Sequence, residues 1–291
     1  MKYAHFLITR FNLPLAWTKD KNNVSTLTEE WLEHRYELFM RYGLPSVVSQ
    51  TSKDFIWVLL FHDKTPEKYM RKNEELEKEY PFCRFCYLDD EEANSLTDYL
   101  DGLVKDNIHT DTEYVITTRL DNDDSIAVDF IKEIARVAKM NESKACYAIN
   151  PLHGLQYFAD YNMSMSVNYP KSHFSSIVEP VSDSYRTAYG YNHNRLKHSC
   201  KVYQTAKGKV MWMEVCHATN VSNDARLRWV LRPVRKGFDG KAFAISPLTT
   251  AGCSTLYFRL LVIIPRAMKI SLKRLVSKAQ DKREKRRINL K

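Results

Sequence analysis

The amino-acid sequence predicts an α/β protein built around a mostly parallel sheet that is flanked by helices. Strand-like and helix-like segments alternate through the first half of the chain, which is the pattern of βαβ units. The segment Phe55–Phe61 is an unbroken apolar run, typical of a strand that is covered on both faces. Acidic side chains gather where the fourth strand is expected to end, and open α/β sheets bind ligands beyond the carboxyl ends of their strands.

The expected elements follow one another in a regular order. A strand over residues 3–9 precedes a helix over residues 26–42, which opens with a Thr26-x-x-Glu29 capping box. Three more strands and three more helices continue the alternation, and the last helix carries an apolar stripe at helical spacing. The strands are expected over residues 54–63, 82–88 and 113–118, the helices over residues 65–80, 91–106 and 125–140, and the stripe comprises Ile126, Phe130, Ile134 and Ala138.

Composition narrows the class of protein. Of the 291 residues, 44% are apolar and 27% are charged, as in ordinary folded domains. The N-terminus MKYAHFLITRF lacks a small-residue cleavage site, so we expect no signal peptide, and no apolar run approaches the ~18 residues of a transmembrane helix. Six thinly spread cysteines indicate reduced thiols and a cytoplasmic location. The close pair CRFC lacks further zinc ligands and is interpreted as part of a strand.

The basic charge of the chain is concentrated at its C-terminal end. Residues 266–291 hold eleven of the 44 Lys and Arg residues and two of the 35 Asp and Glu residues. This segment therefore accounts for the whole net charge of +9, and residues 1–265 are neutral overall. We therefore expect one domain over residues 1–255 and a basic amphipathic C-terminal tail over residues 256–291, whose helix is expected to begin near Pro265. This helix is expected to attach to an anionic membrane surface, or to pack on the body and end in a solvated charge run. Its apolar stripe comprises Met268, Leu272, Leu275 and Val276, with Pro265 near the expected first turn.

The segment Thr117–Ser125, TTRLDNDDS, places three carboxylates within four positions. Two unit charges about 4 Å apart repel by about 4 kcal/mol near a protein surface, so a cation, a helix N-terminus or solvent must offset the repulsion. An ordinary helix N-cap explains one carboxylate at most. Asp121 and Asp123 form an Asp-x-Asp pattern, and such carboxylates suit Mg²⁺ or Mn²⁺, with phosphate oxygens completing the metal shell.

Several stretches of the chain resemble the family of bacterial rhamnosyltransferases. The similarity rests on HFLITRFNLPL, LPSVVSQ, DKTP and RLDNDD and covers roughly residues 3–225. That family in turn resembles nucleotide-sugar glycosyltransferases with the GT-A fold. The resemblance therefore implies a Rossmann-like GT-A domain, a nucleoside-diphosphate sugar as donor, and Mn²⁺ or Mg²⁺ as the Lewis acid that neutralises the leaving diphosphate.

The resemblance also implies roles for individual residues. Asp123 is expected to be the first metal ligand, with Asp124 as an alternative, while Asp121 is expected to reach the ribose or the metal. His217 in VMWMEVCHATN follows a late strand and is expected to be a third ligand or an ordinary hydrogen-bonded residue at a strand end. The residues expected to face the nucleotide and its diphosphate are Thr9, Arg10, Asn12 and Arg119, where surface ion pairing is the alternative for the two arginines.

An inverting transferase needs a carboxylate that deprotonates the acceptor hydroxyl. In the GT-A pattern this base lies between the metal motif and the late histidine, where HFSSIVEPVSDSY supplies Glu179 and Asp183. Asp160 and Glu214 are further candidates. A retaining enzyme would need no such base, and the alternative for Glu179 is an exposed loop position.

These features predict a hexosyl- or rhamnosyl-type glycosyltransferase (EC 2.4) of polysaccharide biosynthesis. It is expected to act on a cell-surface glycan or lipid-linked acceptor, peripherally attached to the cytoplasmic face of the inner membrane. One alternative is a haloacid-dehalogenase-type phosphatase, because DNDDS is similar to its strand-end Asp-x-Asp-x-Thr motif. Another is a non-catalytic module that binds membranes or nucleic acid through the tail. A nucleic-acid partner is not expected, because the neutral body offers no basic groove.

Overall fold

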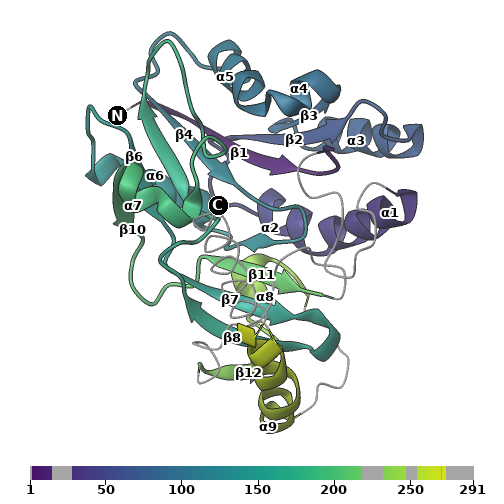
Figure 1. Cartoon of the computed structure of the whole chain (residues 1–291). Helices are drawn as coiled ribbons and strands as arrows, with labels where there is room; N and C mark the ends of the chain where they lie inside the picture. The colour runs from purple at the N-terminus through teal and green to yellow at the C-terminus, as the bar shows by residue number, and fades with distance from the viewer. Residues whose placement is uncertain (1, 15–27, 218–231, 247–253, 270, 273–291) are drawn as a thin grey trace, which may run out of the picture.

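The computed structural model describes residues 2–14, 28–217, 232–246, 254–269 and 271–272. Within these ranges the chain forms two sheets, and helices surround the larger one (Figure 1). The larger sheet has seven strands in the order β10-β6-β9-β4-β1-β2-β3. Its strands are β1 (Tyr3–Arg10), β2 (Ile56–His62), β3 (Cys83–Leu88), β4 (Tyr114–Arg119), β6 (Tyr147–Asn150), β9 (Ser176–Pro180) and β10 (Lys201–Gln204).

The larger sheet is mostly parallel. β1 pairs in parallel with β2 and β4, β2 with β3, and β6 with β10, whereas β9 runs antiparallel to β4 and β6. The predicted α/β fold with a mostly parallel sheet is therefore confirmed. Because β1 and β4 run in the same direction, Arg10 and Arg119 both lie at the carboxyl edge of the sheet.

Alternate side chains of the central strands enter two apolar cores. Leu7 and Trp57 belong to one core, while Ile8 and Val58 belong to the other. Helices cover both faces, so the interpretation of the apolar run Phe55–Phe61 as a doubly covered strand is confirmed. The first core is covered by α1 (Glu29–Leu38), α2 (Leu44–Val48), α3 (Glu67–Glu79) and α6 (Phe130–Met140), and the second by α4 (Asp90–Asn94) and α5 (Leu96–Asp106).

The smaller sheet has five strands in the order β12-β8-β7-β11-β5. β11 pairs in parallel with β7 and antiparallel with β5. The acidic turn lies between β4 and β5, so it connects the larger sheet to the smaller one. The remaining elements are β5 (Ser125–Ile126), β7 (His153–Phe158), β8 (Met163–Asn168), β11 (Trp212–Cys216), β12 (Val234–Lys236), α7 (Leu196–Ser199), α8 (Gly240–Phe243) and the 3₁₀ turns η2 (Ala159–Tyr161) and η3 (His193–Arg195).

The helix expected over residues 125–140 begins later than its apolar stripe predicts. Ser125 and Ile126 form β5 and pair with β11, and α6 begins at Phe130 after Asp129. Ile126 fits a helical period, but its backbone groups are used by a neighbouring strand. As a consequence, no carboxylate of the acidic turn is the N-cap of α6, and that alternative explanation of the cluster is wrong.

Other boundaries differ in smaller ways. The N-cap of α1 is Thr28, whose hydroxyl accepts a hydrogen bond from the Trp31 N–H, and Thr26 of the expected capping box lies outside the described residues. The helix then continues through a π-helical segment, η1 (Phe39–Gly43), into α2. The helix expected over residues 91–106 is divided at Ser95 into α4 and α5. CRFC lies in β3, as predicted.

The C-terminal helix begins before the expected position. Its first residues are α9 (Thr255–Tyr257), which is followed by the π-helical η5 (Phe258–Ile263) and a helical stretch over residues 264–269. Pro265 therefore lies inside the helix rather than in its first turn. The π-helical segment precedes this proline, which lacks the N–H that a regular helix requires.

One side of this helix is buried and another is exposed. Phe258 and Val262 enter the larger core, whereas Met268 and Leu272 are exposed. Leu275 and Val276 of the expected stripe lie outside the described residues. In the part of the chain that the structure describes, no helix combines the length and apolar character needed to cross a bilayer.

Candidate active site at the acidic turn

The backbone of the acidic turn is held closely by the segment that follows α1. A side chain at Gly43 would approach the Asn122 carbonyl oxygen to 2.9 Å, so only glycine fits without movement there. The Ser125 hydroxyl donates to the Tyr42 carbonyl at 3.0 Å, and the Ile126 N–H donates to the Ser46 hydroxyl at 3.3 Å. These contacts hold the turn against η1 and α2.

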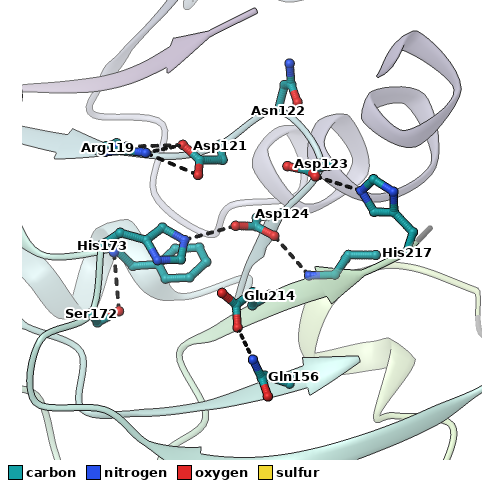
Figure 2. A network of polar contacts seen from close by, with 12 residues as sticks. Arg119, Asp121, Asn122, Asp123, Asp124, Gln156, Ser172, His173, Glu214 and His217 are labelled. Atoms are coloured by element: carbon teal, nitrogen blue, oxygen red, sulfur yellow. Dashed lines mark hydrogen bonds and ion pairs between the residues drawn. The ribbon is translucent and has the colours of Figure 1, made fainter. Parts of the chain in front are cut away.

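Asp123 is held in a buried ion pair. Its carboxylate accepts a hydrogen bond from the Arg35 guanidinium at 2.5 Å. It also contacts Nε2 of His217 at 2.8 Å (Figure 2). The side chains of all three residues are at most 6% exposed. Burial opposes ionisation of Asp123, but Arg35 and His217 more than offset it, so the pKa of Asp123 lies below its ordinary value. We call Arg35, Asp123 and His217 the paired corner.

Asp121 and Asp124 face a different group of residues. Their carboxylate oxygens and a ring nitrogen of His173 all lie within 4.8 Å of one another, which is close enough to share one metal ion. Asp124 accepts hydrogen bonds from the Val215 N–H at 2.9 Å and contacts Nε2 of His173 at 3.0 Å (Figure 2). We call Asp121, Asp124 and His173 the open corner.

The charges of the open corner are unevenly compensated. Asp121 forms an ion pair with two nitrogen atoms of the Arg119 guanidinium. Burial raises the pKa of Asp121, but the charge of Arg119 opposes this effect and the pKa is lowered overall. In the described residues, Asp124 contacts no Arg or Lys side chain. Burial, followed by the charges of Asp123 and Asp121, raises the pKa of Asp124 well above its ordinary value. Burial also lowers the pKa of His173, which favours the neutral ring that a metal ligand requires.

Glu214 adds a further carboxylate beside the open corner. It lies on β11 next to Val215, and its carboxylate accepts a hydrogen bond from the Gln156 side chain of β7 (Figure 2). Its charge contributes to the raised pKa of Asp124. Glu214 thus comes from the smaller sheet, and Asp121 comes from the turn that connects the larger sheet to the smaller one.

The structure brings two of the four expected nucleotide-binding residues together at the sheet edge. The guanidinium groups of Arg10 and Arg119 lie over the Tyr189 ring, 5.0 and 5.6 Å from its centroid. Thr9 is fully buried, and its hydroxyl accepts a hydrogen bond from the Trp57 indole N–H at 3.0 Å.

Asn12 has its own partners. Its amide contacts Thr65 of the DKTP motif at 3.0 Å and accepts a hydrogen bond from the His62 N–H at 3.1 Å. These bonds connect the segment after β1 with the segment after β2, so Asn12 contributes to the shape of the edge beside Arg10.

The candidate bases lie in different places. Glu179 pairs with Val115 on β4, roughly 13 Å along the strand from Arg119 and away from the acidic turn. Its carboxylate accepts hydrogen bonds from the N–H groups of Arg186 and Thr187, and burial raises its pKa. Asp183 and Asp160 are exposed, and the structure does not bring either of them to the open corner.

Two residues of the site were not identified from the sequence. Arg35 lies on α1 together with the buried Leu32 and Tyr36, and a charged residue within this apolar stripe is a signal of a buried partner. His173 precedes β9, in the same segment that contains the expected base Glu179. A lone histidine in a polar connection carries no comparable signal in the sequence.

The residues of the open corner fit a divalent metal ion. Two carboxylates and one imidazole are oxygen and nitrogen donors of the kind that Mn²⁺ accepts, and Mg²⁺ binds through one or two carboxylates completed by phosphate oxygens. Burial and the neighbouring carboxylates of Asp123 and Asp121 raise the pKa of Asp124, and a bound cation would offset both effects.

Comparison with known proteins identifies the family. A family model described as "Putative rhamnosyl transferase" matches residues 4–228. No curated protein matches the chain. Among solved structures, TarS 1–349 of S. aureus is 12% identical with a TM-score of 0.40, and its complex with UDP is 13% identical with a TM-score of 0.41. Each match covers 74% of this chain, which spans 60% and 61% of those chains, respectively. Because the family model covers most of its length, the chain belongs to the rhamnosyl transferase family of glycosyltransferase-like proteins.

Proposed function

We propose that the chain is a metal-dependent, inverting glycosyltransferase that moves a sugar from a nucleoside-diphosphate donor to a glycan or lipid-linked acceptor. Membership of the family supports sugar transfer. The observation that carries the metal dependence is the open corner, where Asp121, Asp124 and His173 present ligand atoms within 4.8 Å of one another. Asp123 and His217 belong to the paired corner, so we assign them to supporting the turn beside the metal.

Each remaining residue of the edge has a role that follows from its chemistry. When bound, Mn²⁺ or Mg²⁺ would stabilise the negative charge that develops on the leaving diphosphate. Arg10 and Arg119 converge on Tyr189 and would bind the diphosphate oxygens. Glu214 lies across the junction and would accept the proton of the acceptor hydroxyl. Glu179 is an alternative base, although its carboxylate is occupied by two backbone N–H groups.

A panel of nucleotide sugars tests this proposal. We expect one uridine or deoxythymidine diphosphate sugar to raise the melting temperature and to be hydrolysed slowly, both only with Mn²⁺ or Mg²⁺ present. Asp124→Asn should abolish both effects. Asp183→Asn, an acid-to-amide change at an exposed position after β9, is the matched control and should preserve them. Phosphate release from simple phosphomonoesters without nucleotide-sugar binding would instead support a phosphatase.

We also propose that residues 256–291 attach the catalytic region, residues 1–255, to the cytoplasmic face of the membrane. The helix exposes apolar side chains between basic ones, and the following residues continue the basic run. Apolar side chains can enter the headgroup region while Lys and Arg contact anionic lipid. The exposed apolar side chains are Leu256, Leu260, Leu261, Met268 and Leu272, and each of them is at least 50% exposed.

Vesicle sedimentation tests the attachment. The full chain should sediment with vesicles containing an anionic lipid, less at high salt, and Leu260→Glu should reduce the bound fraction. Val181→Glu introduces the same charge at an exposed apolar position in the loop after β9 and should leave binding unchanged. Equal sedimentation of the Leu260→Glu variant and the unmodified chain would contradict an apolar contact with lipid.

A further inference from the structure

Two cysteines occupy matching positions on neighbouring parallel strands. Cys146 directly precedes β6 and Cys200 directly precedes β10, and the strands are aligned with Tyr147 opposite Lys201. Neighbouring strands lie about 4.8 Å apart, and disulfides join Cα atoms that are about 4.4–6.8 Å apart. The backbone of Cys200 is extended, and its thiol interacts with the sulfur of Cys146. The backbone geometry therefore already suits a disulfide.

The surroundings of this pair favour reaction at Cys146. Both cysteines are partly exposed, whereas Cys83 and Cys216 are buried. The Tyr191 hydroxyl lies 3.3 Å from the Cys146 sulfur. The thiol of Cys200, and next the Tyr191 hydroxyl, stabilise the Cys146 thiolate and lower its pKa, while the pKa of Cys200 is raised. A thiolate is the attacking species in disulfide exchange.

We propose that Cys146 and Cys200 form a reversible disulfide by exchange with a low-molecular-weight disulfide such as glutathione disulfide. The Cys146 thiolate attacks one sulfur of glutathione disulfide, which breaks the S–S bond and releases one glutathione thiolate. The Cys200 thiolate then attacks the Cys146 sulfur of the mixed disulfide and releases the second glutathione. The two cysteines are oxidised, glutathione disulfide is reduced, and the two thiol protons end on the two glutathiones.

The bond would join the edge strand β10 covalently to β6. This pair of cysteines is remote from the acidic turn. Tyr147, next to Cys146, pairs with Val178 of β9, and the neighbouring Glu179 lies at the end of β4 that points away from that turn. The inference therefore does not rest on the metal site proposed at the acidic turn. In a reducing cytoplasm, disulfides of this kind are transient and responsive to redox conditions.

Peptide mapping tests the proposal on the full chain. The protein is incubated with glutathione disulfide, remaining thiols are alkylated, and the chain is digested with trypsin without reduction. We expect a cross-linked species of residues 145–171 with residues 198–201, which disappears on reduction with dithiothreitol. Recovery of both peptides as separate alkylated thiols, or as separate glutathione adducts, would overturn the proposal.

Variants separate the two steps. Cys200→Ser should accumulate glutathione at Cys146, because the resolving thiol is absent, whereas Cys146→Ser should leave Cys200 largely unmodified. Cys86→Ser removes another partly exposed cysteine and should keep the cross-link. Equal glutathione labelling of Cys146 and Cys200 in the two single variants would contradict the assigned order of attack.

Discussion

Asp123 and Asp124 are neighbours in the chain, but the surroundings of their carboxylates differ. Asp123 points to the paired corner, where Arg35 and His217 contact it from two other segments of the chain. Asp124 points to the open corner, where its contacts are one backbone N–H and His173. The first carboxylate is compensated by the protein, whereas burial beside other carboxylates disfavours ionisation of the second and raises its pKa.

The difference suggests a division of labour within one turn. A buried carboxylate with a guanidinium partner stabilises the turn, because removing either partner leaves an unpaired charge. A buried carboxylate without such a partner makes folding less favourable and is therefore typical of a functional site. The paired corner should thus matter most for stability, and the open corner most for binding a cation.

The largest expected effect is on stability, at the paired corner. Asp123→Ala leaves the Arg35 guanidinium buried without its carboxylate, so we expect a loss of about 3–5 kcal/mol of unfolding free energy. Chemical denaturation measures this loss. The double variant Asp123→Ala with Arg35→Met should recover most of the lost stability, because both charges of the pair are then absent. A stable Asp123→Ala variant would contradict a structural role for the pair.

The next effect is on metal-dependent stabilisation, at the open corner. With Mn²⁺ at about 100 times its dissociation constant, binding should stabilise the folded chain by about 2.7 kcal/mol. Asp121→Asn should remove most of this gain, because one carboxylate ligand is lost, while Arg119 remains partly exposed to water. Thermal denaturation with Mn²⁺ and with a chelator measures the difference. An unchanged Mn²⁺ effect would contradict the assignment of Asp121.

The smallest effect is a gain in stability for Asp124→Asn without metal. In the folded state the pKa of Asp124 is raised, whereas in the unfolded state it is the ordinary value of about 3.9. As the pH rises above this value, the carboxyl ionises more readily in the unfolded chain than in the folded chain. The unmodified protein therefore loses stability as the pH rises. The amide avoids this loss and should stabilise the chain by roughly 1–2 kcal/mol at neutral pH. Denaturation in chelator from pH 4 to pH 7 should show the advantage growing with pH; a constant difference would contradict the raised pKa.

The order of strands and helices could be predicted from the sequence, because strand and helix periods alternate clearly in the first half. The position of the acidic turn at the carboxyl edge follows from the same order. The pairing of β5 with β11 could not be predicted, because Ser125 and Ile126 form a strand only through contact with a segment that is distant in sequence. Long-range pairing of this kind overrides a local helical period.

The composition of the site was only partly predictable, for the same reason. Asp121, Asp123 and Asp124 are adjacent in the chain, so the sequence shows their shared location. Arg35 compensates Asp123, and His173 completes the open corner beside Asp124; these two residues reach the turn from α1 and from the segment before β9. The family motif LPSVVSQ has a structural explanation: Ser46 and Gln50 bind the backbone of residues 126, 127 and 131 after the turn.

The most direct test of the division between the two corners is Mn²⁺ binding followed by electron paramagnetic resonance. The comparison uses two matched variants, His173→Gln in the open corner and His217→Gln in the paired corner. We predict that the unmodified chain binds one Mn²⁺, that His173→Gln weakens binding about tenfold or more, and that His217→Gln leaves it within about twofold. Loss of Mn²⁺ binding in His217→Gln with full retention in His173→Gln would contradict the account.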